Sequence, residues 1–347
     1  MISCGLQCIT CDYPVHMDTY VGCSHNCKYC FTAGKSKKIA RNMANIKPLP
    51  NVKGVRDFIN GKRNLETMCF NWDIPLHWGA NSDPFQECER DHKASLDVLK
   101  VFAETKYPFM VSTKNPVLLT EEPYLSLVSE CECIIQISMA CSKYDALEPG
   151  APKFEERLKV AEILSKHVTR VVARVQPYMV NCKKDIIAEL PRMKQAGIHG
   201  IIISGYFTHK KQKGMVKMGA KYHFPDDVLA RDFKQIKEAC KENGLAFTCA
   251  EDGLSWLSDD IKCCGTIDLD QYHPTPFTLD RIAYTPETAI PNEVMKQVGT
   301  TRPFKSWKAT QAWALKLKTQ SYYDVMMSIE PLHTEYCRNN MKKYGSD

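Results

Sequence analysis

The sequence predicts an α/β protein whose main part is a partial (β/α)6-type TIM barrel. From about residue 76 onward, short apolar runs alternate with amphipathic stretches of helical period. The apolar runs are continuous and rich in β-branched residues, which is typical of parallel strands covered on both faces. The chain has 347 residues, of which 44% are hydrophobic, so it is long enough for one large barrel and an appendage. About six or seven strand–helix units favour a barrel over a doubly wound sheet.

Each strand is predicted from a short apolar run that ends at polar or turn-forming residues. The run at 200–205, for example, places three consecutive isoleucines after a glycine. Such runs are too short for helices and too rich in β-branched residues for loops. The predicted strands cover residues 75–79, 109–113, 133–138, 169–177, 200–205 and 245–249.

The stretches between these strands have the apolar spacing of helices. Leu96, Leu99 and Phe102 share one helical face in the first of them. Gly197 ends the stretch after the fourth strand, as glycine commonly does just past a helix. The predicted helices cover residues 92–105, 121–130, 154–167, 183–197 and about 226–243.

The domain boundaries follow from where this alternation begins and ends. We predict a cysteine-containing N-terminal segment at 1–17, the barrel at 18–265, and a C-terminal extension or cap at 266–347. Barrels of this kind carry their chemistry on loops after the C-terminal strand ends. Functional residues are therefore expected at those ends.

Composition favours a cytoplasmic protein with metal-binding cysteines. The first residues lack the basic and apolar regions of a secretory signal, and no apolar stretch approaches the ~18 residues of a membrane span. Seventeen cysteines in a reducing compartment point to metal ligation rather than disulfides. About half are expected to be small buried hydrophobes, for example Cys69, Cys182, Cys240 and Cys337. The net charge of +6 permits an anionic partner without requiring one.

The strongest motif is a loop with three cysteines, Cys23, Cys27 and Cys30, at x3 and x2 spacing. Three thiolates can bind three irons of a [4Fe–4S] cubane and leave the fourth iron open. A structural zinc ion normally takes four protein ligands, so this set lacks one. An open iron suits chelation of the amino and carboxylate groups of S-adenosylmethionine. The aromatic Tyr29 before the last cysteine supports a loop that holds both cluster and S-adenosylmethionine.

A second set of cysteines, Cys4, Cys8 and Cys11, repeats this spacing at the N-terminus. It lacks the aromatic residue and the preceding glycine. Two interpretations stay open: a second metal site that shares ligands with Cys263 and Cys264, or plain packing.

Residues 18–31, 79–84, 112–115, 136–138 and 147–152, together with Arg157, carry a family resemblance that extends over residues 15–250. This part of the chain resembles the spore photoproduct lyase-like branch of the radical S-adenosylmethionine enzymes. The resemblance implies a partial barrel with an N-terminal cluster loop, and an external electron donor of flavodoxin or ferredoxin type. It also implies that Ser82, Lys114 and Ser138 contact S-adenosylmethionine; the alternatives are loop capping for the serines and a solvated lysine.

Two positions depart from that branch. Ala80 stands where those enzymes have a cysteine that returns hydrogen to the product radical, and Phe31 replaces an assisting tyrosine. Spore photoproduct repair by that route is therefore disfavoured, and modification or rearrangement is favoured. Other thiols are candidate hydrogen donors, namely Cys141, Cys249, Cys263 and Cys264.

Three stretches with lysine or arginine but no acid, at 28–47, 206–222 and 302–323, favour a nucleotide or DNA substrate. Cations follow phosphates, and aromatic faces can stack on unpaired bases. The alternative is a solvated helix whose tryptophans pack on the barrel. We therefore predict radical chemistry, of lyase or isomerase type, on a thymine-derived nucleobase. The alternatives are radical modification of a protein or small molecule, and an iron–sulfur or zinc nucleic-acid binding protein without catalysis.

Overall fold

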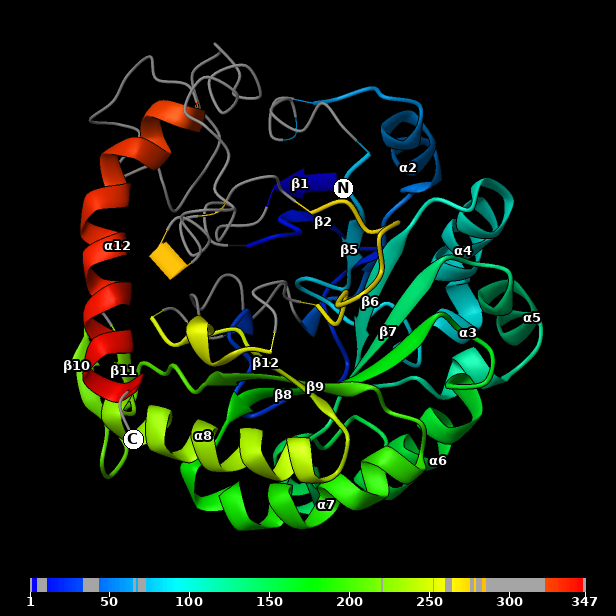
Figure 1. Cartoon of the computed structure of the whole chain (residues 1–347). Coiled ribbons are helices and arrows are strands. Elements are labelled where there is room, and N and C mark those ends of the chain that lie inside the picture. The colour runs from blue at the N-terminus through cyan, green and yellow to red at the C-terminus, as the bar shows by residue number, and fades with distance from the viewer. Residues whose placement is uncertain are drawn as a thin grey trace.

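The fold is described here from a computed structural model, which places an eight-stranded sheet at the centre of the chain (Figure 1). The strand order is β1-β2-β5-β6-β7-β8-β9-β12. The described residues are 2–4, 11–33, 44–64, 67, 73–219, 221–251, 253–259, 264–274, 278, 283–284 and 322–345. The strands of this sheet are β1 (Ile2–Cys4), β2 (Val15–Met17), β5 (Leu76–Trp78), β6 (Phe109–Thr113), β7 (Cys133–Ser138), β8 (Arg170–Tyr178), β9 (Gly200–Gly205) and β12 (Ala246–Cys249).

All neighbouring strands pair in parallel except β1 and β2, which are antiparallel. Strands β1 and β12 stand at opposite ends of the order, so the sheet does not close on itself. The predicted partial α/β barrel is therefore confirmed. Each predicted strand matches an observed one to within a few residues at either end. Strands β1 and β2 were not predicted, and both lie ahead of the proposed boundary at residue 18.

Helices cover the outer face of the sheet, as the view in Figure 1 shows. Trp78, at the end of β5, packs there between Phe85, Phe102 and Phe109, with ring centroids 5.4–6.0 Å apart. This apolar layer fixes the outward side of each strand, so the alternate residues must point into the barrel. The covering helices are α2 (Val52–Ile59), α3 (Glu89–His92), α4 (Ala94–Thr105), α5 (Tyr124–Ser129), α6 (Phe154–Leu164), α7 (Lys183–Gln195) and α8 (Asp226–Glu242).

The amino-terminal end of the barrel interior is filled by apolar side chains and closed by residues 264–272. Gly265 approaches β8 so closely that a Cβ atom would lie 2.6 Å from Cγ1 of Val172. The Tyr13 hydroxyl donates to the carbonyl of Tyr272 at 3.1 Å and accepts from the Thr266 hydroxyl at 2.9 Å. We call this closing segment the barrel floor. The apolar residues that meet on it are Tyr13, Met110, Ile134, Val172, Ile202, Cys264 and Tyr272.

Two smaller elements flank the barrel. The second basic stretch, residues 206–222, contains most of a hairpin of β10 (Val216–Met218) and β11 (Lys221–His223). The helix α12 (Tyr322–Gly345) packs on α8, where the Tyr336 hydroxyl lies 3.0 Å from a carboxylate oxygen of Asp226. Residues 302–321 of the third basic stretch lie outside the described residues. Within the described part of the chain, no helix combines the length and apolar character needed to cross a membrane.

Candidate active site

The cysteine loop begins at the C-terminal end of β2 and is anchored first by Asp18. After β2 the chain forms β3 (Tyr20–Val21), which pairs with β4 (Lys47–Pro48). The Asp18 carboxylate accepts hydrogen bonds from the backbone N–H groups of Asn81 (3.0 Å) and Ser82 (3.1 Å). Burial raises the pKa of Asp18, although these hydrogen bonds oppose the shift. The start of the cysteine loop is therefore tied to the loop after β5.

Gln86 fixes the backbone on both sides of Cys23. Its amide nitrogen donates to the carbonyl of Gly22 at 3.1 Å, and its amide oxygen accepts from the N–H of Ser24 at 2.8 Å. The Gln86 side chain is fully buried. Gly22 has a φ of 86°, a left-handed conformation that favours glycine. The direction of the Cys23 side chain is thus set by a buried side chain and a glycine turn.

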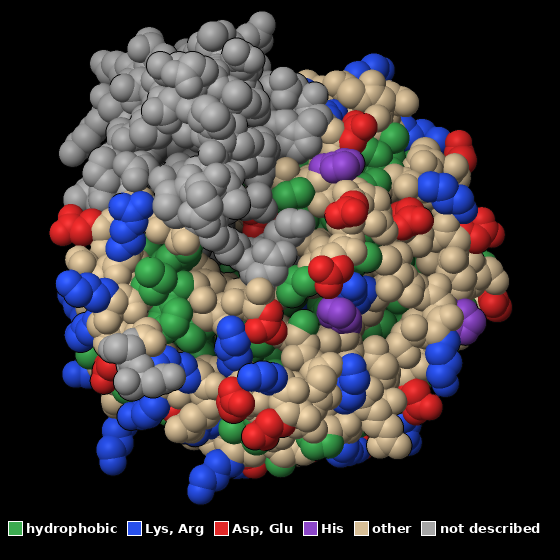
Figure 2. Space-filling model, viewed as in Figure 1, with side chains coloured by type: hydrophobic (Ala, Val, Ile, Leu, Met, Phe, Trp, Pro, Cys, Tyr) green, Lys and Arg blue, Asp and Glu red, His purple; other side chains and the backbone are tan. Residues whose placement is uncertain are grey.

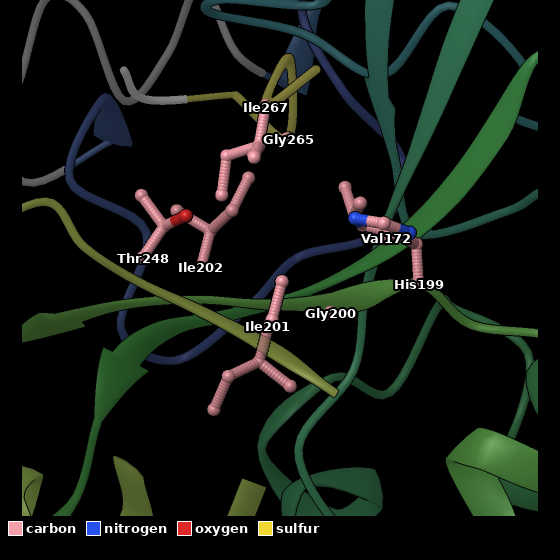
Figure 3. Close-up of a pocket in the computed structure, with 9 residues that line it drawn as sticks. Val172, His199, Gly200, Ile201, Ile202, Thr248, Gly265 and Ile267 are labelled. Atoms are coloured by element: carbon pink, nitrogen blue, oxygen red, sulfur yellow. The ribbon is translucent and has the colours of Figure 1, made fainter. Parts of the chain in front are cut away.

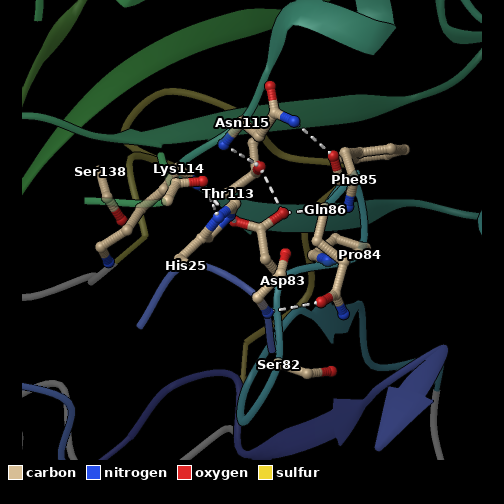
Figure 4. A network of polar contacts seen from close by, with 12 residues as sticks. His25, Ser82, Asp83, Pro84, Phe85, Gln86, Thr113, Lys114, Asn115 and Ser138 are labelled. Carbon is tan, nitrogen blue, oxygen red and sulfur yellow. Dashed lines mark hydrogen bonds and ion pairs between the residues drawn. The ribbon is translucent and has the colours of Figure 1, made fainter. Parts of the chain in front are cut away.

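Asp83 and His25 join the cysteine loop to the loops after β5 and β6 (Figure 4). The Asp83 carboxylate lies 3.0 Å from Nε2 of His25 and accepts hydrogen bonds from the Thr113 hydroxyl (2.8 Å) and the Lys114 backbone N–H (2.6 Å). Burial alone would raise the pKa of Asp83. The charge of His25 and the hydrogen bonds outweigh burial and lower this pKa to about 2. The carboxylate is therefore ionised at neutral pH.

The loop after β7 forms the third support of the cysteine loop. The carbonyl of Gly150 lies 2.9 Å from Nδ1 of His25, and the N–H of Gly150 donates to the His25 carbonyl at 3.1 Å. The Lys28 N–H donates to the Leu147 carbonyl at 2.9 Å. A Cβ atom on Gly150 would lie 2.5 Å from the carbonyl oxygen of Ser24, so only glycine allows this approach. The loops after β5 and β7 thus bond directly to the cysteine loop, and the loop after β6 is joined to it through Asp83.

The three thiols of this loop fit an iron–sulfur cluster by their chemistry. Burial raises the pKa of Cys23 to about 11 and that of Cys27 to about 12, and Lys114 opposes both shifts. Thiolates here need additional positive charge, which iron ions provide when they bind. In the described part of the chain, no three His, Cys, Asp or Glu side chains converge tightly enough for a single metal ion. Cubane ligands bind separate irons, and soft thiolates suit them.

Tyr29 belongs to a buried polar chain that reaches the end of β7. Its hydroxyl donates to Glu148, which also pairs with Arg157. Arg157 in turn donates to the backbone carbonyl of Ser138 at 2.5 Å. Burial and the Glu148 carboxylate raise the pKa of Tyr29, so its hydroxyl stays protonated. Nζ of Lys114 lies 5.6 Å from the centre of the Tyr29 ring.

Three residues predicted to contact S-adenosylmethionine, Ser82, Lys114 and Ser138, lie around the His25–Asp83 pair (Figure 4). Lys114 and Ser138 lie on one side of the His25–Asp83 pair, and Ser82 lies on the other (Figure 4). The Ser82 hydroxyl donates to the Tyr20 carbonyl at 2.8 Å and is buried. Ser138 is buried at the C-terminal end of β7.

The candidate hydrogen donors lie in different parts of the fold. Cys141 and Cys249 are buried in the apolar core between sheet and helices, and the neighbouring Cys182 thiol raises the pKa of Cys141. Cys264 lies inside the barrel, with Sγ 4.0 Å from Nδ1 of His77. Cys263 lies outside the described residues, as does Cys8 of the second cysteine set.

Sequence reasoning missed the supports of the cysteine loop. Gln86 and Asp83 are 62 and 58 positions from their partners Ser24 and His25 (86 − 24 and 83 − 25). Two signals were available: both residues follow a predicted strand, where polar residues often serve the site, and Asp83 lies in segment 79–84 of the family resemblance.

Two hollows in the structure lie away from this site. The first, between β8, β9, β12 and the barrel floor, is lined by Ile202, Thr248 and Gly265 and has no room for a water molecule (Figure 3). The second has a volume of about 280 Å³ and is lined by Arg170 and His199 at the amino-terminal strand ends. Neither is a candidate for the chemistry expected at the cysteine loop.

Comparison with known proteins gives distant likenesses. No protein-family profile matches the chain. An uncharacterized protein of Mycobacterium tuberculosis is 24% identical over 214 residues, which are 56% of this chain and 59% of that protein. An uncharacterized Mycobacterium bovis protein gives the same values. The chain thus spans about three fifths of the length of the curated relatives that it matches.

Solved structures resemble about two thirds of the chain. Streptococcus suis SuiB bound to the precursor peptide SuiA is 12% identical with a TM-score of 0.49, over 71% of this chain and 51% of SuiB. Native anSMEcpe with bound AdoMet is 11% identical with a TM-score of 0.45, over 67% of this chain and 63% of that one. At these identities and TM-scores, the likenesses identify neither a family nor a substrate.

Proposed function

We propose that this chain is a radical S-adenosylmethionine enzyme that holds a [4Fe–4S] cluster on Cys23, Cys27 and Cys30. The observation that carries the proposal is the cysteine loop, which hydrogen bonds to the loops after β5 and β7 fix at the open end of a partial barrel. Three thiolates leave the fourth iron free for the amino and carboxylate groups of S-adenosylmethionine. An external donor of flavodoxin or ferredoxin type supplies the electron.

The chemistry of the bound cluster is reductive cleavage of S-adenosylmethionine to a 5′-deoxyadenosyl radical, which takes a hydrogen atom from the substrate. The chain's own residues bind and orient the cofactor. Lys114 meets the methionine carboxylate as a point charge, next to Tyr29 and Ser138. Ser82 acts indirectly, since its hydroxyl holds the Tyr20 carbonyl at the start of the loop. Cys264 is the described thiol that lines the barrel interior, and we assign it hydrogen return to the product radical. The S–H bond breaks as the product C–H bond forms, and the external electron donor then reduces the resulting thiyl radical, which takes up a proton.

We propose a nucleobase or nucleotide as the substrate, modified or rearranged by a reaction of lyase or isomerase type. The supporting observation is the β10–β11 hairpin with the loop before it, residues 206–223, which contain no acid. In Figure 2, basic side chains gather at the lower left, where Figure 1 places this hairpin. An exposed basic hairpin can follow a phosphate backbone. Its five exposed lysines are Lys210, Lys211, Lys213, Lys217 and Lys221.

The test is anaerobic formation of 5′-deoxyadenosine. The protein is reconstituted with iron and sulfide, reduced with dithionite and given S-adenosylmethionine, with and without a thymine-containing oligonucleotide. Cys27→Ala should abolish both the brown chromophore and 5′-deoxyadenosine, because an iron loses its ligand. The control Cys11→Ala, from the second cysteine set, should keep both.

Each alternative gives a different result in this experiment. Stimulation by the oligonucleotide that weakens steeply with salt supports a nucleic-acid substrate. Formation without such stimulation points to a protein or small-molecule substrate. No 5′-deoxyadenosine from a protein with a full, reducible cluster overturns the proposal in favour of a metal-containing binding protein.

A further inference from the structure

Several inward-facing residues of the barrel strands are polar, in contrast to the apolar residues that meet on the floor. Strand register puts Arg174 of β8 beside Ser138 of β7, and Gln136 beside Ser112. Partners in register point to the same face of a parallel sheet, here the interior face. This set is called the polar layer, and its members are His16, His77, Ser112, Gln136 and Arg174.

Arg174 is held in this layer by neutral groups. One terminal nitrogen donates to the Ser112 hydroxyl at 3.0 Å and to the Gln136 side-chain oxygen, and the other donates to Gln176. Gln136 is itself fixed to the barrel floor, because its amide donates to the Cys264 carbonyl at 3.1 Å. In the part of the chain that the structure describes, no carboxylate lies within ion-pair distance of the guanidinium.

The two histidines beside Arg174 carry no compensating charge. Burial, followed by the charge of Arg174, lowers the pKa of His16 to about 4. Burial, His16 and Arg174 also lower the pKa of His77 well below its usual value. Both rings are therefore neutral at pH 7. Arg174 is the one formally charged member of the polar layer.

A half-buried cation without an anionic partner is costly, and such groups are usually paired. One terminal nitrogen of Arg174 contacts Ser112, Gln136 and His77, and the other donates to Gln176. Nε–H has no partner among the described residues, and the Gln176-bound nitrogen has one partner for its two N–H groups. Nε–H and a terminal N–H of a guanidinium can donate two parallel hydrogen bonds to one oxyanion.

We propose that Arg174 binds an anionic group of the substrate, a phosphate or a carboxylate, inside the barrel beside Ser138. This inference rests on the function proposed above and narrows its substrate class to molecules with such a group. Arg174 therefore determines which substrates bind. It holds the anionic group of the substrate and does not contact the atoms that react with the cofactor. The neighbouring position of Ser138 in β7 places this anchor next to the proposed S-adenosylmethionine site.

Binding can be tested without turnover. Isothermal titration calorimetry on the reconstituted protein uses inorganic phosphate, thymidine 5′-monophosphate, thymidine and glutarate as probes. Saturable one-to-one binding of a phosphate or a carboxylate probe is expected, and the probe that binds identifies the oxyanion. Arg174→Gln, which keeps hydrogen bonding but not charge, should weaken that binding about 10- to 100-fold. Arg174→Lys should retain part of the affinity for the probe. The exposed control Arg192→Gln should retain all of this affinity.

Unchanged affinity in Arg174→Gln, or no saturable oxyanion binding by the wild type, overturns the proposal. If Arg174→Gln does not fold, phenylglyoxal modification of the wild type decides instead. Phosphate or glutarate should protect Arg174 but not Arg192, as mapped by mass spectrometry, and equal modification of Arg174 with and without them overturns the proposal. Formation of 5′-deoxyadenosine is measured separately, so failure of the radical chemistry is distinguishable from failure of oxyanion binding.

Discussion

At the scale of single residues, one carboxylate connects the loops around the proposed cluster. Asp83 accepts from the N–H of Phe85, the hydroxyl of Thr113 and the N–H of Lys114, and it pairs with His25. The backbone donors fix the turn after β5 and the start of the loop after β6. His25 belongs to the cysteine loop, so its contact with Asp83 joins that loop to the other two. Because the group is buried and ionised, its loss leaves several donors without an acceptor.

Asp83→Asn should therefore destabilise the protein by about 3 kcal/mol, a typical cost of breaking a buried ion pair. The asparagine amide would face the Lys114 N–H or His25, both of which need an acceptor. Thermal unfolding measures the loss. Asp57→Asn, an exposed carboxylate between Lys53 and Lys62, serves as the control and should cost far less. Equal losses in the two variants would contradict the role of Asp83.

The same residue predicts a pH dependence. The pKa of Asp83 falls to about 2 in the folded protein, below the value of ~3.9 for an unfolded chain. A depressed carboxyl pKa stabilises the fold above the unfolded value, and this contribution is lost as pH falls from about 4 to 2. Urea unfolding of the wild type should show this loss, worth about 2 kcal/mol. Asp83→Asn should show a flatter profile over the same range.

At the scale of elements, the loop after β7 must approach the cysteine loop very closely. Gly150 exchanges backbone contacts with His25, and a Cβ atom there would lie 2.5 Å from the Ser24 carbonyl oxygen and 2.9 Å from Cα of His25. Both neighbours are backbone atoms, which cannot rotate away as a flexible side chain can. The two loops would have to separate to accept any larger residue.

Gly150→Ala should lower the iron content after reconstitution by at least half, and reduce the melting temperature. Gly54→Ala is the matched control, since nothing lies within 4 Å of a Cβ atom at this position in helix α2. Alanine should be neutral there or stabilise by up to ~1 kcal/mol. Iron per chain and thermal unfolding are measured for both. Full iron loading of Gly150→Ala would contradict the need for close approach.

At the scale of the whole molecule, local sequence patterns predicted the repeated strand–helix units but not strands β1 and β2 at the edge of the sheet. The six predicted strands have apolar runs flanked by amphipathic helices, a signal contained within each unit. Strand β2 has only the residues Val15–Met17, too few to show a period, and it becomes a strand by pairing with β5. The spacing of Cys23, Cys27 and Cys30 is also contained in one short segment, so the sequence alone predicted the cysteine loop. The His25–Gly150 contact joins positions 125 apart, which no spacing in the sequence reveals.

The barrel floor is the longest-range feature of the fold, and it supports the last prediction. The Tyr13 hydroxyl bonds to Thr266, 253 positions away, and to the Tyr272 carbonyl. Tyr13→Phe keeps the ring in the apolar interior but removes both hydrogen bonds, at about 1 kcal/mol each. Amide hydrogen exchange of residues 264–272 should accelerate about 10-fold or more, because the floor opens locally.

A matched control separates this effect from a general loss of stability. Tyr222→Phe, on the half-exposed β11 strand, should leave exchange in 264–272 unchanged. Unchanged exchange in Tyr13→Phe would mean that apolar packing alone holds the floor. Because Gln136 links the floor to the polar layer, acceleration there should also weaken the binding measured at Arg174. The stability of the amino-terminal end of the barrel would then set the geometry of the site at its other end.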